Sequence, residues 1–79
     1  MYENGIEEKV CTYVKNRSGE KIALVCDTDR GYLIVPLNES VKGKLIPKTR
    51  EDLIEDTLIQ LNADSRDIKR VIKLLESLR

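Results

Sequence analysis

The hydrophobic period of this chain changes once, and that change constrains its fold more than any other feature. Between residues 10 and 38, apolar side chains occur in short runs rich in β-branched residues, which is typical of strands. Between residues 49 and 79 they recur at the spacing of one face of a helix. A length of 79 residues suffices for one domain but not for two. The sequence therefore predicts a single α+β domain over residues 1–79, with its strands before its helices.

The first half is predicted to form a β-meander over residues 10–38. Its two connections, residues 16–19 and 28–31, each end in glycine and have the composition of tight turns. Pro36 has no N–H to donate to a ladder, so the third strand is predicted to lie at an edge of the sheet. The three predicted antiparallel strands occupy residues 10–15, 21–27 and 32–37.

Two segments that flank the meander have weaker patterns. Residues 1–9 have no clear period and are predicted to be a frayed lead-in. Residues 39–48 are predicted to be a linker or to contain a short fourth strand at Leu45 and Ile46, which Pro47 would end. The sheet is thus expected to have three strands, with four as the alternative.

The register of the first two strands decides whether the two cysteines meet. A three-residue loop between Asn16 and Glu20 places Val10 opposite Cys26 and leaves one face of the sheet coherently apolar. A two-residue loop would instead place Cys11 opposite Cys26, which permits a disulfide but mixes polar and apolar side chains on each face. We favour the first register, and two cysteines are few for a disulfide scaffold. Both thiols are therefore expected to be free.

Residues 49–79 are predicted to form an antiparallel helical hairpin. Thr49 is the expected N-cap of the first helix, which ends near Asn62, a residue that tolerates the left-handed conformation. Asp64 or Ser65 is expected to cap the second helix, whose apolar stripe is the more regular of the two. A connection this short implies that the two helices are neighbours running in opposite directions.

Both faces of the predicted sheet are apolar. In the second strand Leu24 and Cys26 alternate with Ala23 and Val25, whereas a sheet with one face in water alternates apolar and polar side chains. Two short helices cover only one face, so the other is expected to need a partner surface. We therefore predict a small regulatory protein that acts through protein–protein contacts, as a homodimer. The predicted interface residues are Tyr13, Val25, Leu33, Val35 and Leu37.

The second predicted helix also carries a basic face opposite its apolar stripe. Such a face contacts phosphates in nucleic-acid-binding proteins, which gives the alternative function of a nucleic-acid-binding regulator. The other interpretation is a solvated polar face in which Asp67 pairs with Arg70. The chain has 14 basic and 14 acidic residues, and this balance argues against a general affinity for nucleic acid. The predicted nucleic-acid-binding residues are Arg66, Lys69, Arg70 and Lys73.

The composition gives no support for catalysis, a metal or a cofactor. The chain has no histidine, and its two cysteines lack the paired spacing of a zinc site. The sequence has no phosphate-loop motif, and without histidine neither cysteine has the usual partner that activates a catalytic thiol. We therefore predict a protein that is not an enzyme, with no catalytic residue, metal ligand or cofactor.

The start of the sequence does not have the pattern of a signal peptide, and no apolar stretch approaches the length of a membrane-spanning helix. With free thiols the expected location is the cytoplasm, and no membrane partner is expected. The motifs present are turn and cap signals that unrelated domains share, so no family resemblance follows from them.

Overall fold

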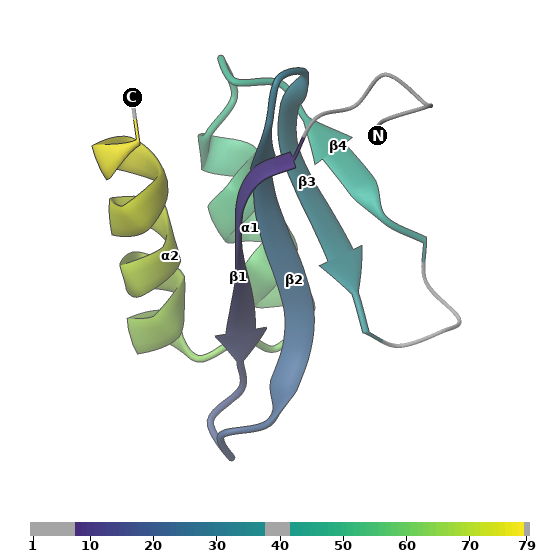
Figure 1. Ribbon diagram of the computed structural model, residues 1–79. Helices are drawn as coiled ribbons and strands as arrows, with labels where there is room; N and C mark the ends of the chain where they lie inside the picture. Colours follow the sequence, from purple (N-terminus) through teal and green to yellow (C-terminus); the bar gives the residue numbers. More distant parts are fainter. Residues whose placement is uncertain (1–7, 38–41, 79) are drawn as a thin grey trace.

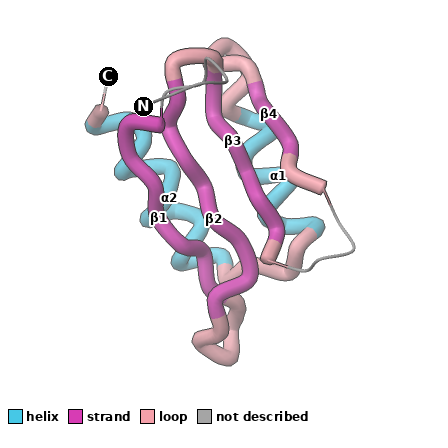
Figure 2. Tube along the Cα trace, turned by 45° about the vertical axis from the view of Figure 1, so that its right-hand side comes forward, coloured by secondary structure: helices cyan, strands magenta, loops and turns pink. Residues whose placement is uncertain are grey.

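The structure is a computed structural model, and it describes residues 8–37 and 42–78 of the chain. The elements are, in chain order, β1 (Glu8–Lys15), β2 (Lys21–Thr28), β3 (Gly31–Pro36), β4 (Lys44–Ile46), α1 (Asp52–Gln60) and α2 (Ser65–Ser77). The four strands form one antiparallel sheet in sequence order (Figure 1). Both helices lie on the same face of that sheet, α2 behind β1 and α1 behind β3 and β4 (Figure 2). The predicted α+β meander followed by a helical hairpin is confirmed.

The ends of the sheet differ from the prediction in two places. Glu8 and Lys9 belong to β1, so a frayed lead-in over residues 1–9 is wrong for these two, while residues 1–7 lie outside the described part. The fourth strand is confirmed, and β3 is consequently not an edge strand as Pro36 suggested. β4 pairs only with residues 32–34 of β3, so the proline nitrogen lies beyond the end of that ladder.

The turn between β1 and β2 has the three-residue loop that the sequence predicts. The Asn16 N–H donates to the Glu20 carbonyl oxygen at 2.9 Å, and the Gly19 N–H donates to the Asn16 carbonyl oxygen at 3.0 Å. The Asn16 side-chain oxygen also accepts the N–H groups of Ser18 and Glu20, at 2.9 and 3.0 Å. Asn16 thus fixes this turn through its backbone and its side chain together.

A β-bulge interrupts the ladder just beyond this turn and changes which residues face each other. The shift lies next to Val14, which pairs with Ala23, and it brings Cys11 opposite Cys26. A bulge adds one residue to one strand and moves the following pairs by one position. The predicted register, with Val10 opposite Cys26, is wrong because it assumed that the pairing set by the loop continues unchanged along the whole strand.

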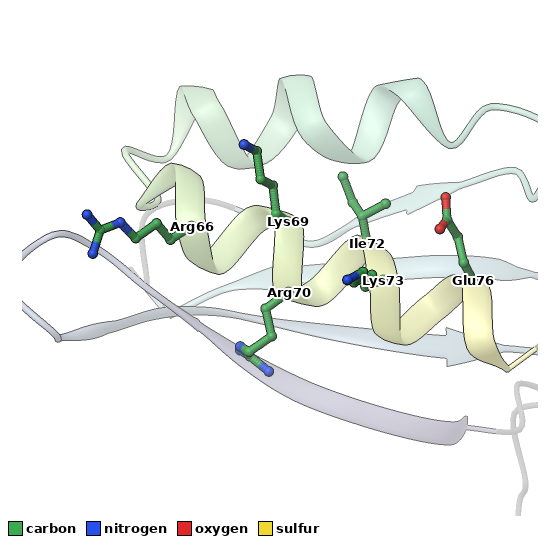
Figure 3. A pocket seen from close by; sticks show the side chains of 6 residues that line it. All are labelled: Arg66, Lys69, Arg70, Ile72, Lys73 and Glu76. Atoms are coloured by element: carbon green, nitrogen blue, oxygen red, sulfur yellow. The ribbon is translucent and has the colours of Figure 1, made fainter.

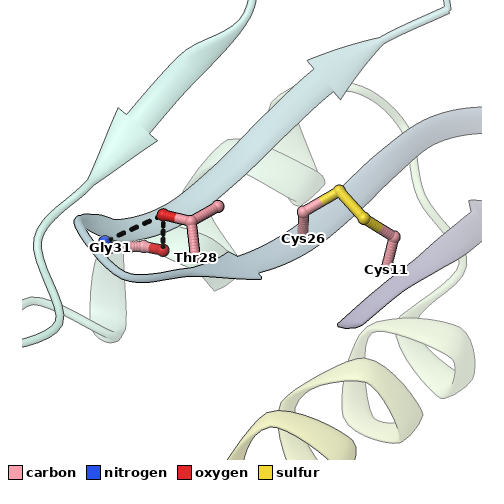
Figure 4. The surroundings of a disulfide bond; sticks show 4 residues. All are labelled: Cys11, Cys26, Thr28 and Gly31. Carbon is pink, nitrogen blue, oxygen red and sulfur yellow. Dashed lines mark hydrogen bonds between the residues drawn. A yellow bond between two sulfur atoms is a disulfide. The ribbon is translucent and has the colours of Figure 1, made fainter. Parts of the chain in front are cut away.

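The two cysteines form a disulfide between the edge strand β1 and the central strand β2 (Figure 4). Their Cα atoms are 4.0 Å apart, and the sequence separation is 15 residues. Cys11 is exposed and Cys26 is buried. The prediction of two free thiols is therefore wrong, and the bulge is the physical cause. Disulfides are uncommon in the cytoplasm, so the cysteines give no support to a cytoplasmic location.

One buried hydroxyl group holds the turn between β2 and β3. Thr28 Oγ1 donates to the Gly31 carbonyl oxygen at 2.8 Å and accepts the N–H groups of Arg30 and Gly31, at 3.1 and 3.2 Å (Figure 4). Gly31 has a φ of 148°, and a β-carbon at this position would overlap the carbonyl oxygen of Ile46 in β4. Glycine therefore lets the start of β3 lie directly against the end of β4.

The hydrophobic core fills the space between the sheet and the helices, and both predicted apolar stripes face it. Full burial of an aliphatic side chain of this size stabilises the fold by about 1.5–3 kcal/mol. The strands contribute Val14, Ala23, Val25, Tyr32, Ile34 and Ile46, and the helices contribute Ile54, Leu58, Ile68, Val71 and Leu75.

The ends of the helices follow the prediction in part. α1 begins at Asp52 rather than directly after Thr49, because a separate turn precedes it, in which the Arg50 N–H donates to the Pro47 carbonyl oxygen at 3.0 Å. The hairpin connection matches the prediction, since Asn62 has a left-handed φ of 67°. The two helices run in opposite directions (Figure 1).

Candidate interaction surfaces

The face of the sheet away from the helices carries apolar side chains from all four strands, and we call it the open sheet face. Pairing arranges them in two cross-strand rows, of which Tyr13, Leu24 and Val35 form one. The disulfide, Leu33 and Leu45 form the other row. Tyr13 is 44% exposed and Leu45 is 43% exposed, at opposite edges of the sheet. Neither helix covers this face (Figure 2).

Three of the five predicted interface residues lie on the open sheet face. Tyr13, Leu33 and Val35 belong to its two rows. Leu37, 45% exposed, follows β3 outside the ladder and lines a hollow with Gln60 and Leu61 at the end of α1. The prediction of Val25 as an interface residue is wrong, because Val25 lies on the opposite face and is 0% exposed within the core. The predicted register placed Tyr13 on the same face as Val25, and the bulge separates them.

Two residues of the open sheet face were not singled out from the sequence. Leu24 lies in the row between Tyr13 and Val35, and Leu45 pairs with Leu33. The sequence signal for Leu24 was its place on an apolar strand, but its face depends on the register. Leu45 belongs to this face because β4 forms, and from the sequence this fourth strand was only an alternative.

The pair of Asp67 and Arg70 joins α2 to the edge strand β1. Arg70 Nε donates to Asp67 Oδ1 at 2.7 Å, and Arg70 Nη2 donates to the Tyr13 carbonyl oxygen at 2.7 Å. Asp67 Oδ2 in turn accepts the Lys15 N–H at 2.7 Å. The hydrogen bond from Arg70, supported by that from Lys15, lowers the pKa of Asp67, and the same pair raises the pKa of Arg70. Arg70 is therefore engaged in holding α2 against β1.

The four predicted nucleic-acid-binding residues line one shallow depression on α2, but they are not equivalent. The depression has a volume of about 530 Å³, and Ile72 and Glu76 complete its lining (Figure 3). Arg70 turns toward β1, whereas Lys69 points toward α1 (Figure 3). The structure thus brings all four residues together and leaves three of them for an external contact: Arg66, Lys69 and Lys73.

Three ion pairs occur among the described residues, and none of them links α1 to α2. Asp27 is buried at the end of β2, where its Oδ1 lies 2.6 Å from Lys48 Nζ. The exposed pair of Arg50 and Asp52 lies at the start of α1, with its nitrogen and oxygen 3.0 Å apart. The third pair is that of Asp67 and Arg70. Within the described part of the chain, the exposed acidic residues of α1 and the exposed basic residues of α2 therefore form no ion pair with each other.

The described residues offer little for catalytic or metal chemistry. They contain no group of three or more His, Cys, Asp or Glu side chains that could hold a metal ion. Both cysteines are consumed by the disulfide, so neither is available as a thiolate nucleophile.

No family model matches the sequence, and no match was found among curated proteins or solved structures. In the part of the chain that the structure describes, no helix is long and apolar enough to cross a membrane. The open sheet face and the basic depression on α2 are therefore the basis for assigning a function.

Proposed function

We propose that this chain is a small, non-enzymatic interaction protein that acts through protein–protein contact and forms a homodimer through its open sheet face. The observation that carries the proposal is the pair of apolar rows on a face that neither helix covers. Exposed apolar patches of this kind mark interaction sites in many proteins. A chain with a formal net charge of zero also meets no overall electrostatic repulsion from a second copy of itself.

The proposed contact is a face-to-face packing of two sheets. Such sheets lie about 10 Å apart, with the side chains of the two inner faces interdigitating. The exposed side chains of Tyr13 and Leu45 lie on β1 and β4, and the half-buried leucine and valine side chains lie between them. A two-fold axis through the face uses the same surface of both copies, as in most homodimers.

Replacing Leu45 by lysine tests this proposal. The wild-type chain is expected to sediment at twice its monomer mass of 9.1 kDa, in about 0.5 M salt, where exposed charges are screened. Leu45→Lys should weaken the dimer at least about tenfold, because a charge would be buried without a partner in an apolar contact. Leu78→Lys is the matched control, since Leu78 is 40% exposed at the end of α2, away from the open sheet face.

Sedimentation equilibrium over a range of concentrations measures both variants. A wild-type chain that remains monomeric at high salt contradicts the proposed dimer. Equal weakening by Leu45→Lys and Leu78→Lys contradicts the assignment of the dimer contact to the open sheet face.

A second candidate function is nucleic-acid binding through α2. One observation favours it: Arg66, Lys69 and Lys73 line a common depression and take part in none of the ion pairs of the described residues. Binding to a DNA duplex should weaken with salt, with a logarithmic slope of about −2.7 for three neutralised phosphates. Reversing these three residues to glutamate should abolish binding, whereas Arg70 is left unchanged because it holds β1.

Reversal of Lys42 and Lys44, which lie outside α2, is the control for this experiment. Binding should survive that change. An affinity that the α2 reversal leaves unaltered excludes this candidate.

A further inference from the structure

The two helices expose opposite charges on one outer surface, which we call the outer helix surface. α1 has no basic residue within its bounds, and no described ion pair joins it to α2. Among the residues that the structure describes, its acidic side chains form one ion pair, the local pair of Asp52 and Arg50, and both of these are exposed. The exposed acidic residues of α1 are Asp52, Glu55 and Asp56, and the exposed basic residues that line the depression on α2 besides Arg70 are Arg66, Lys69 and Lys73.

These charges also lie at matching heights along the two helices. α1 ends and α2 begins at the same short connection, residues 61–64, and the helices run in opposite directions. Residues equally far from the connection therefore lie at about the same height, since each adds about 1.5 Å. Counted from the connection, Asp56 and Lys69 are each the fifth residue of their helix, and Asp52 and Lys73 are each the ninth.

We propose that the outer helix surface binds a second copy of this chain, with α2 of each copy lying against α1 of the other. A two-fold axis that is parallel to the helices and lies just outside the outer helix surface, above the midline between them, sets each helix against the other helix of the second copy and leaves every height unchanged. It sets Lys69 against Asp56 of the second copy, and Lys73 against Asp52. Each contact occurs twice, because the arrangement is symmetric.

The charge pattern selects this axis over the other simple one. A two-fold axis that runs across the helices would stack α1 on α1 and α2 on α2. Like charges would then face each other, which is strongly unfavourable when they are brought into contact. The pattern therefore specifies the orientation of the second copy as well as its identity.

Apolar side chains within the outer helix surface supply the remaining part of the contact. Ile59 is 56% exposed, the largest exposed fraction among the large apolar residues described. Ile72 lines the depression on α2 between the basic side chains (Figure 3). In protein interfaces, charges mainly set orientation and exclude wrong partners, while buried apolar groups supply much of the affinity. The outer helix surface and the open sheet face lie on opposite sides of the molecule, so this contact is independent of the proposed sheet dimer.

Charge reversal on separate copies tests the proposal. All variants carry Leu45→Lys, so that the contribution of the open sheet face is reduced equally in each of them. One chain adds Lys69→Glu and Lys73→Glu, which makes both helices acidic, and another adds Asp52→Lys and Asp56→Lys, which makes both basic. At low salt the Leu45→Lys chain should self-associate, and each reversed chain should do so at least about tenfold more weakly, because like charges then face each other. An equimolar mixture of the two reversed chains should regain the association, because acidic helices then meet basic ones.

Sedimentation equilibrium measures the association, and circular dichroism confirms that each variant is folded. The proposal is overturned if the Leu45→Lys chain stays monomeric up to about 1 mM, or if folded reversed chains do not associate when mixed. Binding of a DNA duplex by the Leu45→Lys chain, without self-association, would also overturn it and assign the surface to nucleic acid. Failure of the sheet dimer is seen separately, in the wild-type chain at high salt.

Discussion

Two glycines hold backbone conformations that other residues adopt poorly, and their surroundings differ. Gly19, in the turn after β1, has a φ of 83° and open space around its α-carbon. Gly31, at the start of β3, has a φ of 148° and lies against the carbonyl group of Ile46 in β4. At Gly19 only the backbone conformation disfavours another residue, whereas at Gly31 the backbone conformation and the lack of space both do so.

We expect Gly31→Ala to destabilise the protein more than Gly19→Ala. The change at Gly19 should lower the free energy of unfolding by about 1 kcal/mol, the usual penalty for a left-handed non-glycine residue. The change at Gly31 should lower it by about 3 kcal/mol, because β3 and β4 must also move apart. Urea unfolding of both variants measures the difference, and equal losses would show that β4 does not press on β3.

The stability of the protein depends on pH through Asp67. The hydrogen bond from Arg70 lowers its pKa below the ordinary value of 3.8, so the ionised form stabilises the fold. That contribution is complete above pH 3.8 and is lost as the pH falls through the lowered pKa.

Asp67→Asn should therefore lower the free energy of unfolding by about 1 kcal/mol near neutral pH, a value reduced by the nearby solvent. Its deficit relative to wild type should be smaller at about pH 2 than near neutral pH, because a growing share of Asp67 is protonated in the folded state as the pH falls through the lowered pKa. Urea unfolding at the two pH values measures this, and Asp56→Asn, at an exposed position of α1, is the control. A deficit that is the same at both pH values would argue against the Asp67–Arg70 contact.

The edge strand β1 is held from two directions. Toward β2 it is tied by the ladder and by the disulfide of Cys11. On its outer edge α2 occupies the backbone groups near its end, where Arg70 donates to the Tyr13 carbonyl oxygen and Asp67 accepts the Lys15 N–H. Unpaired edge strands are templates for pairing with other chains. The side chains of α2 therefore restrict which part of this edge is open to such pairing.

Reduction of the disulfide should lower the stability of the whole fold. Its sequence separation of 15 residues corresponds to about 3 kcal/mol of loop-closure entropy in the unfolded chain. In a domain of this size, that loss lowers the melting temperature by at least about 12 °C. Thermal unfolding with and without a phosphine reductant measures the shift, and Cys11→Ser should melt at the same temperature in both conditions. Identical melting of the wild-type protein in both conditions would contradict the bond.

The whole molecule presents two surfaces of different chemistry on opposite sides. The open sheet face is apolar, and its two rows end at the exposed side chains of Tyr13 and Leu45. The outer helix surface is charged, with acidic residues on α1 and basic residues on α2. Screening by salt acts on the second and leaves the first almost unaffected.

Salt should consequently separate the two proposed contacts. The Leu45→Lys chain should associate in about 20 mM salt and dissociate in about 1 M salt, where the screening length falls to about 3 Å. The Lys69→Glu, Lys73→Glu chain with Leu45 intact should remain dimeric at both concentrations, because its apolar contact does not depend on charge. Light scattering after gel filtration measures both masses. The same salt response in both chains would mean that a single surface is responsible for association.

The element plan of this protein follows from local patterns in its sequence. The change of hydrophobic period separates sheet from helices, because each backbone conformation presents its side chains at a fixed spacing. Asn16 and Gly19 determine the first turn, and Asn62 the end of the first helix, through hydrogen bonds and backbone angles within a few residues. Such features need no knowledge of distant parts of the chain.

All the features that local sequence patterns did not predict depend on contacts between distant segments. The bulge beside Val14 fixes which face Tyr13 occupies and joins Cys11 to Cys26, and periodicity alone does not encode a one-residue shift. Arg70 belongs to a basic stripe by spacing, yet β1 turns it inward through the Tyr13 carbonyl group. The chain's local order thus came from its sequence, whereas the composition of each surface was decided by packing. Packing decides it because a side chain is exposed or buried only relative to the segments that fold against it.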